Sequence, residues 1–112
     1  MKRNNKIYIE DILDSIAKID SYTKGMSFKS FAHNKMVVDA VIRNFEIIGE
    51  AAKNLPQKTK SIYKGIPWKE MAGMRDKVIH EYFGVDLKIV WKTIKKSLPA
   101  LKKSLEKIHR SK

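Results

Sequence analysis

The sequence predicts an all-α protein, an antiparallel bundle of four to five helices. Apolar residues recur at spacings of three and four, as on one face of a helix. No segment alternates apolar and polar residues in the way of a half-buried strand. The 112 residues are enough for one apolar core and too few for two, and there are no repeats or low-complexity segments. We therefore expect a single domain over residues 1–112.

The first helix is expected from about Ile7 to Tyr22, and the loop Thr23-Lys24-Gly25 ends it. Its buried stripe consists of Ile9, Ile12, Ile16 and Ile19.

The second helix is expected to be long, from about Phe28 to Asn54, with Ser27 as its N-cap and Pro56 just beyond its end. Its main seam comprises Val38, Val41, Phe45, Ile48, Ala52 and Leu55. A second stripe comprises Val37, Ala40, Ile47 and Ala51. So wide an apolar face predicts contact with more than one neighbour, which makes this helix the spine of the bundle.

Residues 55–66 read as a basic connector with one short helical turn. Pro67 suits the first position of a third helix, where its missing N–H costs nothing, and that helix would run from Trp68 to about Ile79. Gly84 and Asp86 then provide a helix end and the N-cap of the next helix.

The fourth helix keeps its apolar rhythm through Leu87, Trp91, Ile94, Leu98, Leu101, Leu105 and Ile108. Pro99 lies inside it and should bend it near Leu98, while the stripe continues on both sides.

Lys and Arg number 24 against 12 for Asp and Glu, a formal charge of +12. Such a field attracts polyanions, so nucleic acid is the first partner to test, although an acidic protein or an anionic membrane would be attracted too.

The absence of cysteine excludes disulfides, thiolate nucleophiles and the common zinc ligand sets. The basic start lacks an uninterrupted apolar stretch, and no segment is apolar enough to span a membrane, so a soluble, cytoplasmic protein is expected.

Arg75 occupies a seam position of the third helix, between Met71 and Val78, where the periodicity calls for an apolar residue. An inward arginine needs a partner or a function. It could pair with Glu46 or Glu50 of the second helix, or extend its side chain out at the edge of the bundle.

His80 follows five residues later and can move a proton near neutral pH, while the guanidinium of Arg75 fits a phosphate. RNA cleavage without a metal needs deprotonation of a 2′-hydroxyl, protonation of the leaving 5′-oxygen and stabilisation of charge at phosphorus. Arg75 and His80 cover part of that set. Five residues rotate a straight helix by roughly 140°, so these two side chains would not share a face. Either the helix loosens before His80 or two chains share the site; we favour a two-fold dimer, which supplies a second histidine.

The run Arg75-x4-His80-x-Tyr82 resembles the signature of the HepT toxins of the HEPN superfamily of helical ribonucleases. The resemblance extends over YIEDILDSIAKID, RNFEIIGEAAKNLP, IPWKEMAGMRDKVIHEYFGVD and DLKIVWKTIKKSLPALKKSL. An ordered set of this kind is far more specific than the three-residue motif alone.

The resemblance implies an antiparallel HEPN-like bundle that dimerises around an RNA cleft, with Arg75 and His80 as catalytic residues and no cofactor. It implies a partner, a minimal nucleotidyltransferase (MNT) antitoxin, that transfers AMP to Tyr82 and silences the nuclease. By its seam position alone, Tyr82 would be a core aromatic.

Several other residues are weaker candidates. Lys88, Lys92, Lys95 and Lys96, continued by Lys102 and Lys103, form either an ordinary solvated face or a track of RNA phosphate contacts. His33 and His109 are expected to be exposed, His33 as a possible RNA contact, and neither has metal-ligand spacing. Glu46 and Glu50 could instead pair with Arg43 and Lys53, and Asp76 could help to position the cleft.

Two other functions stay open: a non-catalytic RNA- or substrate-binding subunit of a nucleotidyltransferase, and a helical oligomerisation module.

Overall fold

A computed structural model of the chain describes residues 3–73 and 86–111, and within these residues the regular structure is entirely helical. The prediction of an all-α bundle is confirmed. The elements with defined bounds are α1 (Arg3–Thr23), α2 (Phe28–Ala32), α3 (Lys35–Asn54), α4 (Gln57–Ile62), α6 (Leu87–Lys92), the π-helical turn η2 (Thr93–Ser97) and α7 (Leu98–Ser111). Residues 68–73 are also helical.

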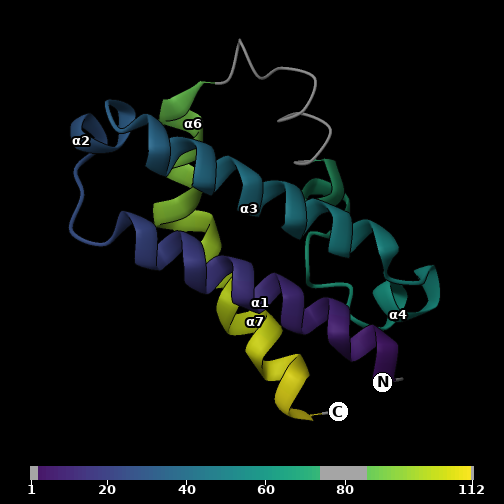
Figure 1. Ribbon diagram of the computed structural model, residues 1–112. Coiled ribbons are helices and arrows are strands. Elements are labelled where there is room, and N and C mark those ends of the chain that lie inside the picture. The colour runs from purple at the N-terminus through teal and green to yellow at the C-terminus, as the bar shows by residue number, and fades with distance from the viewer. Residues whose placement is uncertain (1–2, 74–85, 112) are drawn as a thin grey trace.

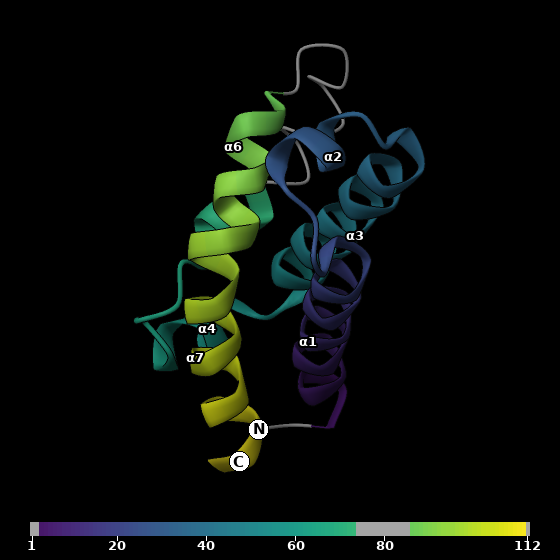
Figure 2. The same cartoon turned by 90° about the vertical axis from the view of Figure 1, so that its left-hand side faces the viewer.

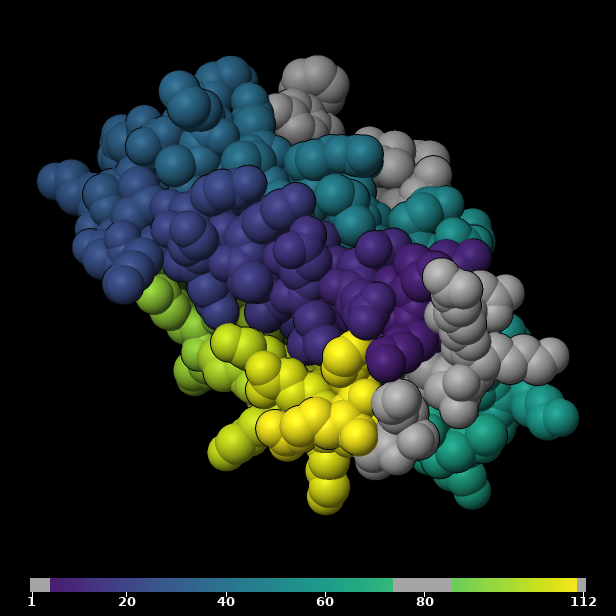
Figure 3. Space-filling view, turned by 60° about the horizontal axis from the view of Figure 1, so that its bottom comes forward, coloured from purple at the N-terminus to yellow at the C-terminus, as the bar shows by residue number. Residues whose placement is uncertain are grey.

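The bundle is built around α1 and α3, which lie side by side and antiparallel, while α7 packs against α1 and α6 lies against α2 (Figures 1 and 2). On the face drawn in Figure 3, α1 lies between α3 and α7. The four isoleucines predicted for the first stripe are at most 1% exposed. All six residues of the predicted seam of the second helix are buried as well. The helical periodicity therefore identified the core correctly.

The expected helix over 28–54 is wrong in one respect, because it is divided into α2 and α3 at His33 and Asn34. Ser27 caps α2 as predicted and forms a capping box with Ser30. Asn34 caps α3, since its side-chain oxygen accepts a hydrogen bond from the Val37 N–H at 3.1 Å. A short polar side chain that satisfies a free helix N–H favours a new helix start at its own position.

The connector contains the expected short helix, α4, which is held to the start of α1 by a buried side-chain hydrogen bond. Asn5 Nδ2 donates to Thr59 Oγ1 at 3.1 Å. Pro67 precedes the next helix rather than occupying its first position, because its carbonyl accepts from the Met71 N–H at 3.0 Å as an N-cap residue does.

The last part of the described chain stays helical from Leu87 to Ser111, and Asp86 caps this helix as predicted, accepting from the Lys88 N–H at 2.9 Å. The disturbance that Pro99 was predicted to cause near Leu98 takes the form of a π-helical turn, η2, in which the Leu98 N–H donates to the Thr93 carbonyl. A proline lacks the N–H for a normal turn, and its ring crowds the carbonyl four residues earlier. A widened turn accommodates both effects without breaking the helix.

Within the described ranges, no helix is both long and apolar enough to cross a membrane.

Candidate nucleic-acid interface

The motif residues Arg75, His80 and Tyr82, and the neighbouring Asp76, lie outside the residues that the structure describes. Their predicted roles stay predictions. The part of the predicted site that the structure does describe is the basic helix surface, which begins at α6, a few positions after the motif in the chain.

Lys88, Lys92, Lys95 and Lys96 are all exposed, two on α6 and two in η2. Further along, Lys103 is exposed and Lys102 is half-buried. The buried positions of the same continuous helix anchor it to the core, and they are Ile94, Leu98, Leu101, Leu105 and Ile108. The basic surface is thus held in place by the apolar seam of its own helix, and its ammonium groups are accessible to a polyanion.

Trp91 lies within this basic surface, on a small aromatic cluster that joins α6 to α2. Its ring centroid is 5.1 Å from that of Phe31 and 6.4 Å from that of Phe28. Lys95 Nζ lies over the Trp91 ring, 4.6 Å from the centroid, within the range of a cation–π contact. Sequence reasoning placed Trp91 in the apolar seam only. The contact between Trp91 and Lys95 could have been predicted, because the two residues are four positions apart on one helix. The contact with Phe31 could not, because Phe31 is far away in the sequence.

A second candidate site is a pocket of about 310 Å³ between α1 and α3. Its charged lining consists of Asp11, Arg43, Glu46 and Glu50. Three carboxylates against one guanidinium make this pocket a poor site for RNA phosphates. Glu46 and Glu50 line this pocket from α3, opposite α1. The expectation that they order Arg75 stays a prediction, because Arg75 lies outside the described residues.

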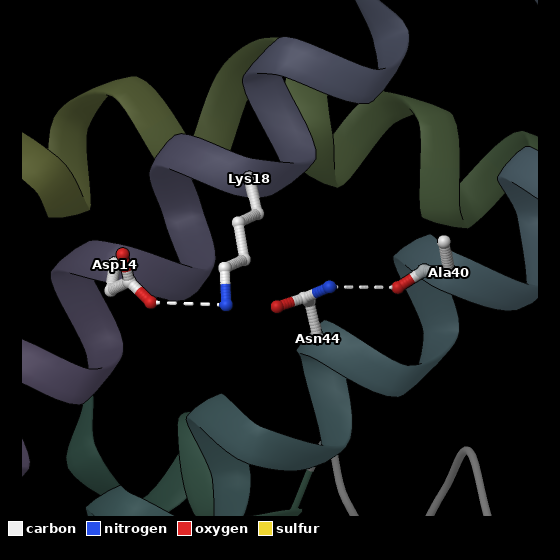
Figure 4. Close-up of polar contacts among 4 residues, drawn as sticks. All are labelled: Asp14, Lys18, Ala40 and Asn44. Carbon is white, nitrogen blue, oxygen red and sulfur yellow. Dashed lines mark hydrogen bonds and ion pairs between the residues drawn. The ribbon is translucent and has the colours of Figure 1, made fainter.

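Asn44 is a buried polar residue of α3, on the side that faces α1. Its Nδ2 donates to the Ala40 carbonyl at 2.9 Å, while Oδ1 has no hydrogen-bond partner among the described residues. Figure 4 shows this oxygen directed toward Lys18 of α1, whose Nζ pairs with Asp14 at 3.2 Å. A buried carbonyl oxygen without a hydrogen-bond partner is costly, so we expect an apolar residue at position 44 to be tolerated.

The two histidines in the described part of the chain differ. His33 is exposed at the C-cap of α2, as predicted, with Nδ1 2.8 Å from the Lys29 carbonyl oxygen. His109 is less exposed than predicted: its side chain is 32% exposed and contacts Glu10 of α1. The hydrogen bond with His109 lowers the pKa of the Glu10 carboxyl, and slight desolvation opposes this shift. Among the residues described, no group of three or more His, Cys, Asp or Glu side chains could hold a metal ion.

A small all-helical bundle with an exposed lysine surface around a half-buried tryptophan has the features of a nucleic-acid-binding protein. Comparison with known families shows which nucleic-acid-binding family this is. The profile of the family described as "Ribonuclease HepT-like" matches residues 12–108. The chain belongs to the HepT-like ribonuclease family, and the predictions of this family, and of a ribonuclease as the type of enzyme, are confirmed.

Individual relatives agree with this membership. The chain is 49% identical over 110 residues to a "Probable ribonuclease HepT" of Thermococcus cleftensis, a match that covers 98% of this chain and all of the relative. It is 50% identical over 108 residues, 96% of this chain, to a Methanocaldococcus jannaschii protein named "Gamma-glutamylcyclotransferase and putative RNase", of which it covers 49%. No solved structure gave a significant match.

Proposed function

We propose that this protein is a metal-independent endoribonuclease toxin of a HepT/MNT toxin–antitoxin system in the cytoplasm. The observation that carries the proposal is the family match over residues 12–108, which includes the whole run Arg75-x4-His80-x-Tyr82. The exposed lysines of α6 and η2 add an attractive surface for the RNA backbone beside that run in the chain.

In the proposed reaction, Arg75 binds the scissile phosphate through its planar set of donors and stabilises the charge that develops there. His80 acts as general acid or base, because an imidazole exchanges a proton near neutral pH. Cleavage requires one proton to leave the 2′-hydroxyl and another to reach the 5′-oxygen. One chain offers a single motif histidine, so a homodimer that joins two motifs in one cleft completes the proposed site.

The proposed control is covalent. An MNT nucleotidyltransferase transfers AMP from ATP to the hydroxyl of Tyr82, two residues after His80, with release of pyrophosphate. The added phosphate brings negative charge next to the place where RNA phosphate would bind, and this repulsion, with the bulk of the nucleotide, stops the nuclease.

The decisive experiment is RNA cleavage by the purified protein in the presence of EDTA. The wild type is expected to degrade RNA, and His80→Ala is expected to be inert while keeping its melting temperature. Activity that disappears with the chelator and returns with a divalent cation would contradict the metal-independent mechanism. Equal inactivity of both variants would instead favour a non-catalytic binding subunit of the nucleotidyltransferase.

A further inference from the structure

Among the described residues, the Trp91 ring packs against the buried ring of Phe31, and the flexible side chain of Lys95 lies over it. Phe31 is fully buried, and its ring lies 5.1 Å from Trp91 at an interplanar angle of 32°. Lys95 is exposed, with its ammonium 4.6 Å from the ring centroid. The aromatic support is therefore fixed, whereas the cover can move, because a lysine side chain is long and flexible.

Lysines stand on both sides of Trp91 along the same helix face. Lys88 precedes Trp91 by three positions and Lys95 follows it by four, the spacings at which helical side chains are neighbours. All the lysines of this row are exposed, and Trp91 is half-buried. An aromatic ring between cations is the combination with which proteins bind single-stranded nucleic acid, since bases stack on the ring and phosphates meet the cations.

We infer that Trp91 is a stacking platform for one unpaired base of single-stranded RNA, with Lys88 and Lys95 binding the phosphates on either side. The base replaces the Lys95 ammonium over the ring, and the released ammonium turns to a phosphate oxygen. Base-paired RNA does not use the platform, because its bases are already stacked within the duplex. The inference rests on the proposed function only in taking RNA as the ligand.

Tryptophan emission reports this contact directly. Trp68 is 7% exposed and donates its indole N–H to the Tyr63 carbonyl, so an added ligand reaches Trp91 and not Trp68. The probe is a single-stranded oligouridylate of about ten nucleotides, a length that one basic groove can hold, added to the His80→Ala protein so that cleavage does not interfere. Saturable quenching is expected, and Trp91→Phe should abolish it.

Affinity provides the second readout. Trp91→Leu is expected to weaken oligouridylate binding about 5- to 100-fold, the range for removal of one base–aromatic stack. Trp91→Phe, which keeps a ring, should retain most of the affinity. The matched control is Tyr22→Leu, which removes a 41% exposed aromatic from α1 and should change nothing. Inorganic polyphosphate, which has charge but no bases, should bind the wild type and Trp91→Leu equally.

Unquenched Trp91 emission at saturating oligouridylate would overturn the inference, as would equal oligouridylate affinity of the wild type and a folded Trp91→Leu. If Trp91→Leu fails to fold, the quenching of the His80→Ala protein decides alone. The two proposals can fail independently. Quenching of Trp91 emission without RNA cleavage by the wild type would contradict the nuclease but support the stacking role of Trp91. Cleavage without quenching would contradict only the stacking role.

Discussion

His109 Nε2 lies 2.9 Å from Glu10 Oε2, and this contact joins α7 to α1 across 99 positions of the chain. The two helices lie against each other in the fold (Figure 3). The polar contact fixes the end of α7 against one turn of α1. The hydrogen bond lowers the pKa of the Glu10 carboxyl, so this contact depends on pH.

Glu10→Gln should lower thermal stability near neutral pH but not at acid pH. The hydrogen bond with His109 lowers the folded-state pKa of Glu10 below its usual value of 4.5. A carboxyl group with a lowered folded-state pKa stabilises the fold above the unfolded-state pKa, and this contribution disappears as pH falls through the folded-state pKa. Melting curves of the wild type and Glu10→Gln should therefore differ well above pH 4.5 and converge below it. Asp20→Asn, an exposed change on α1, is the control. A gap that widens on acidification would contradict this assignment.

Thr59→Val should destabilise the protein because it removes the acceptor of a buried hydrogen bond. Asn5 and Thr59 are at most 8% exposed, and the Asn5 Nδ2 group donates to Thr59 across α1 and α4. Leaving that donor unpaired should cost about 1–3 kcal/mol of unfolding free energy. Urea denaturation at a fixed protein concentration measures it. The control Ser61→Ala, an exposed change on the same helix, should alter stability by less than about 0.5 kcal/mol, and a decrease as large as that of Thr59→Val would refute the buried-bond account.

Asn44→Leu should leave stability unchanged or raise it by about 1 kcal/mol, since it removes a buried oxygen without a partner and keeps the volume filled. Asn44→Ala, which also removes the oxygen but leaves a space between α3 and α1, should be less stable than Asn44→Leu. Urea denaturation of the three proteins gives the order. A clear decrease of stability in Asn44→Leu would mean that the oxygen does have a partner in solution.

The fold could be predicted from the sequence wherever the apolar residues on one helix face determined which side of the helix is buried. The spacing of Ile9, Ile12, Ile16 and Ile19 was enough to identify a stripe that the structure buries. The break before α3 could not be predicted in this way, because the apolar spacing continues through it, while the decisive interaction is a single cap by Asn34. The effect of Pro99 was predicted, but its form was not, since a bend and a π-helical turn relieve the same crowding.

The candidate site could be predicted only in part. The exposed lysines follow from composition and periodicity. The aromatic support of Trp91 does not, because Phe31 reaches it from another helix, and the contact of His109 with Glu10 depends on how α7 crosses α1. The role of the Arg75 motif came from family resemblance and not from spacing, which places Arg75 and His80 on different faces of a straight helix.

Replacing Lys88, Lys92, Lys95 and Lys96 by glutamine should weaken RNA binding and also reduce its dependence on salt. Each phosphate that a lysine neutralises releases counterions, so on a single strand the slope of log affinity against log salt falls by about 0.7 for every phosphate that is no longer neutralised. If all four lysines bind phosphates, the slope changes by about 3 units. Titrations of the His80→Ala protein with oligouridylate at several salt concentrations give this slope.

The matched control replaces four other exposed lysines, Lys24, Lys35, Lys53 and Lys58, and so lowers the net charge by the same amount. A weaker general attraction would affect both quadruple variants alike, because a distant charge acts through the field of the whole protein. Direct binding of phosphates affects only the α6–η2 variant. An equal reduction of slope in the two variants would therefore show that these four lysines act as ordinary surface charge, and a larger reduction in the α6–η2 variant would place the RNA backbone along this helix.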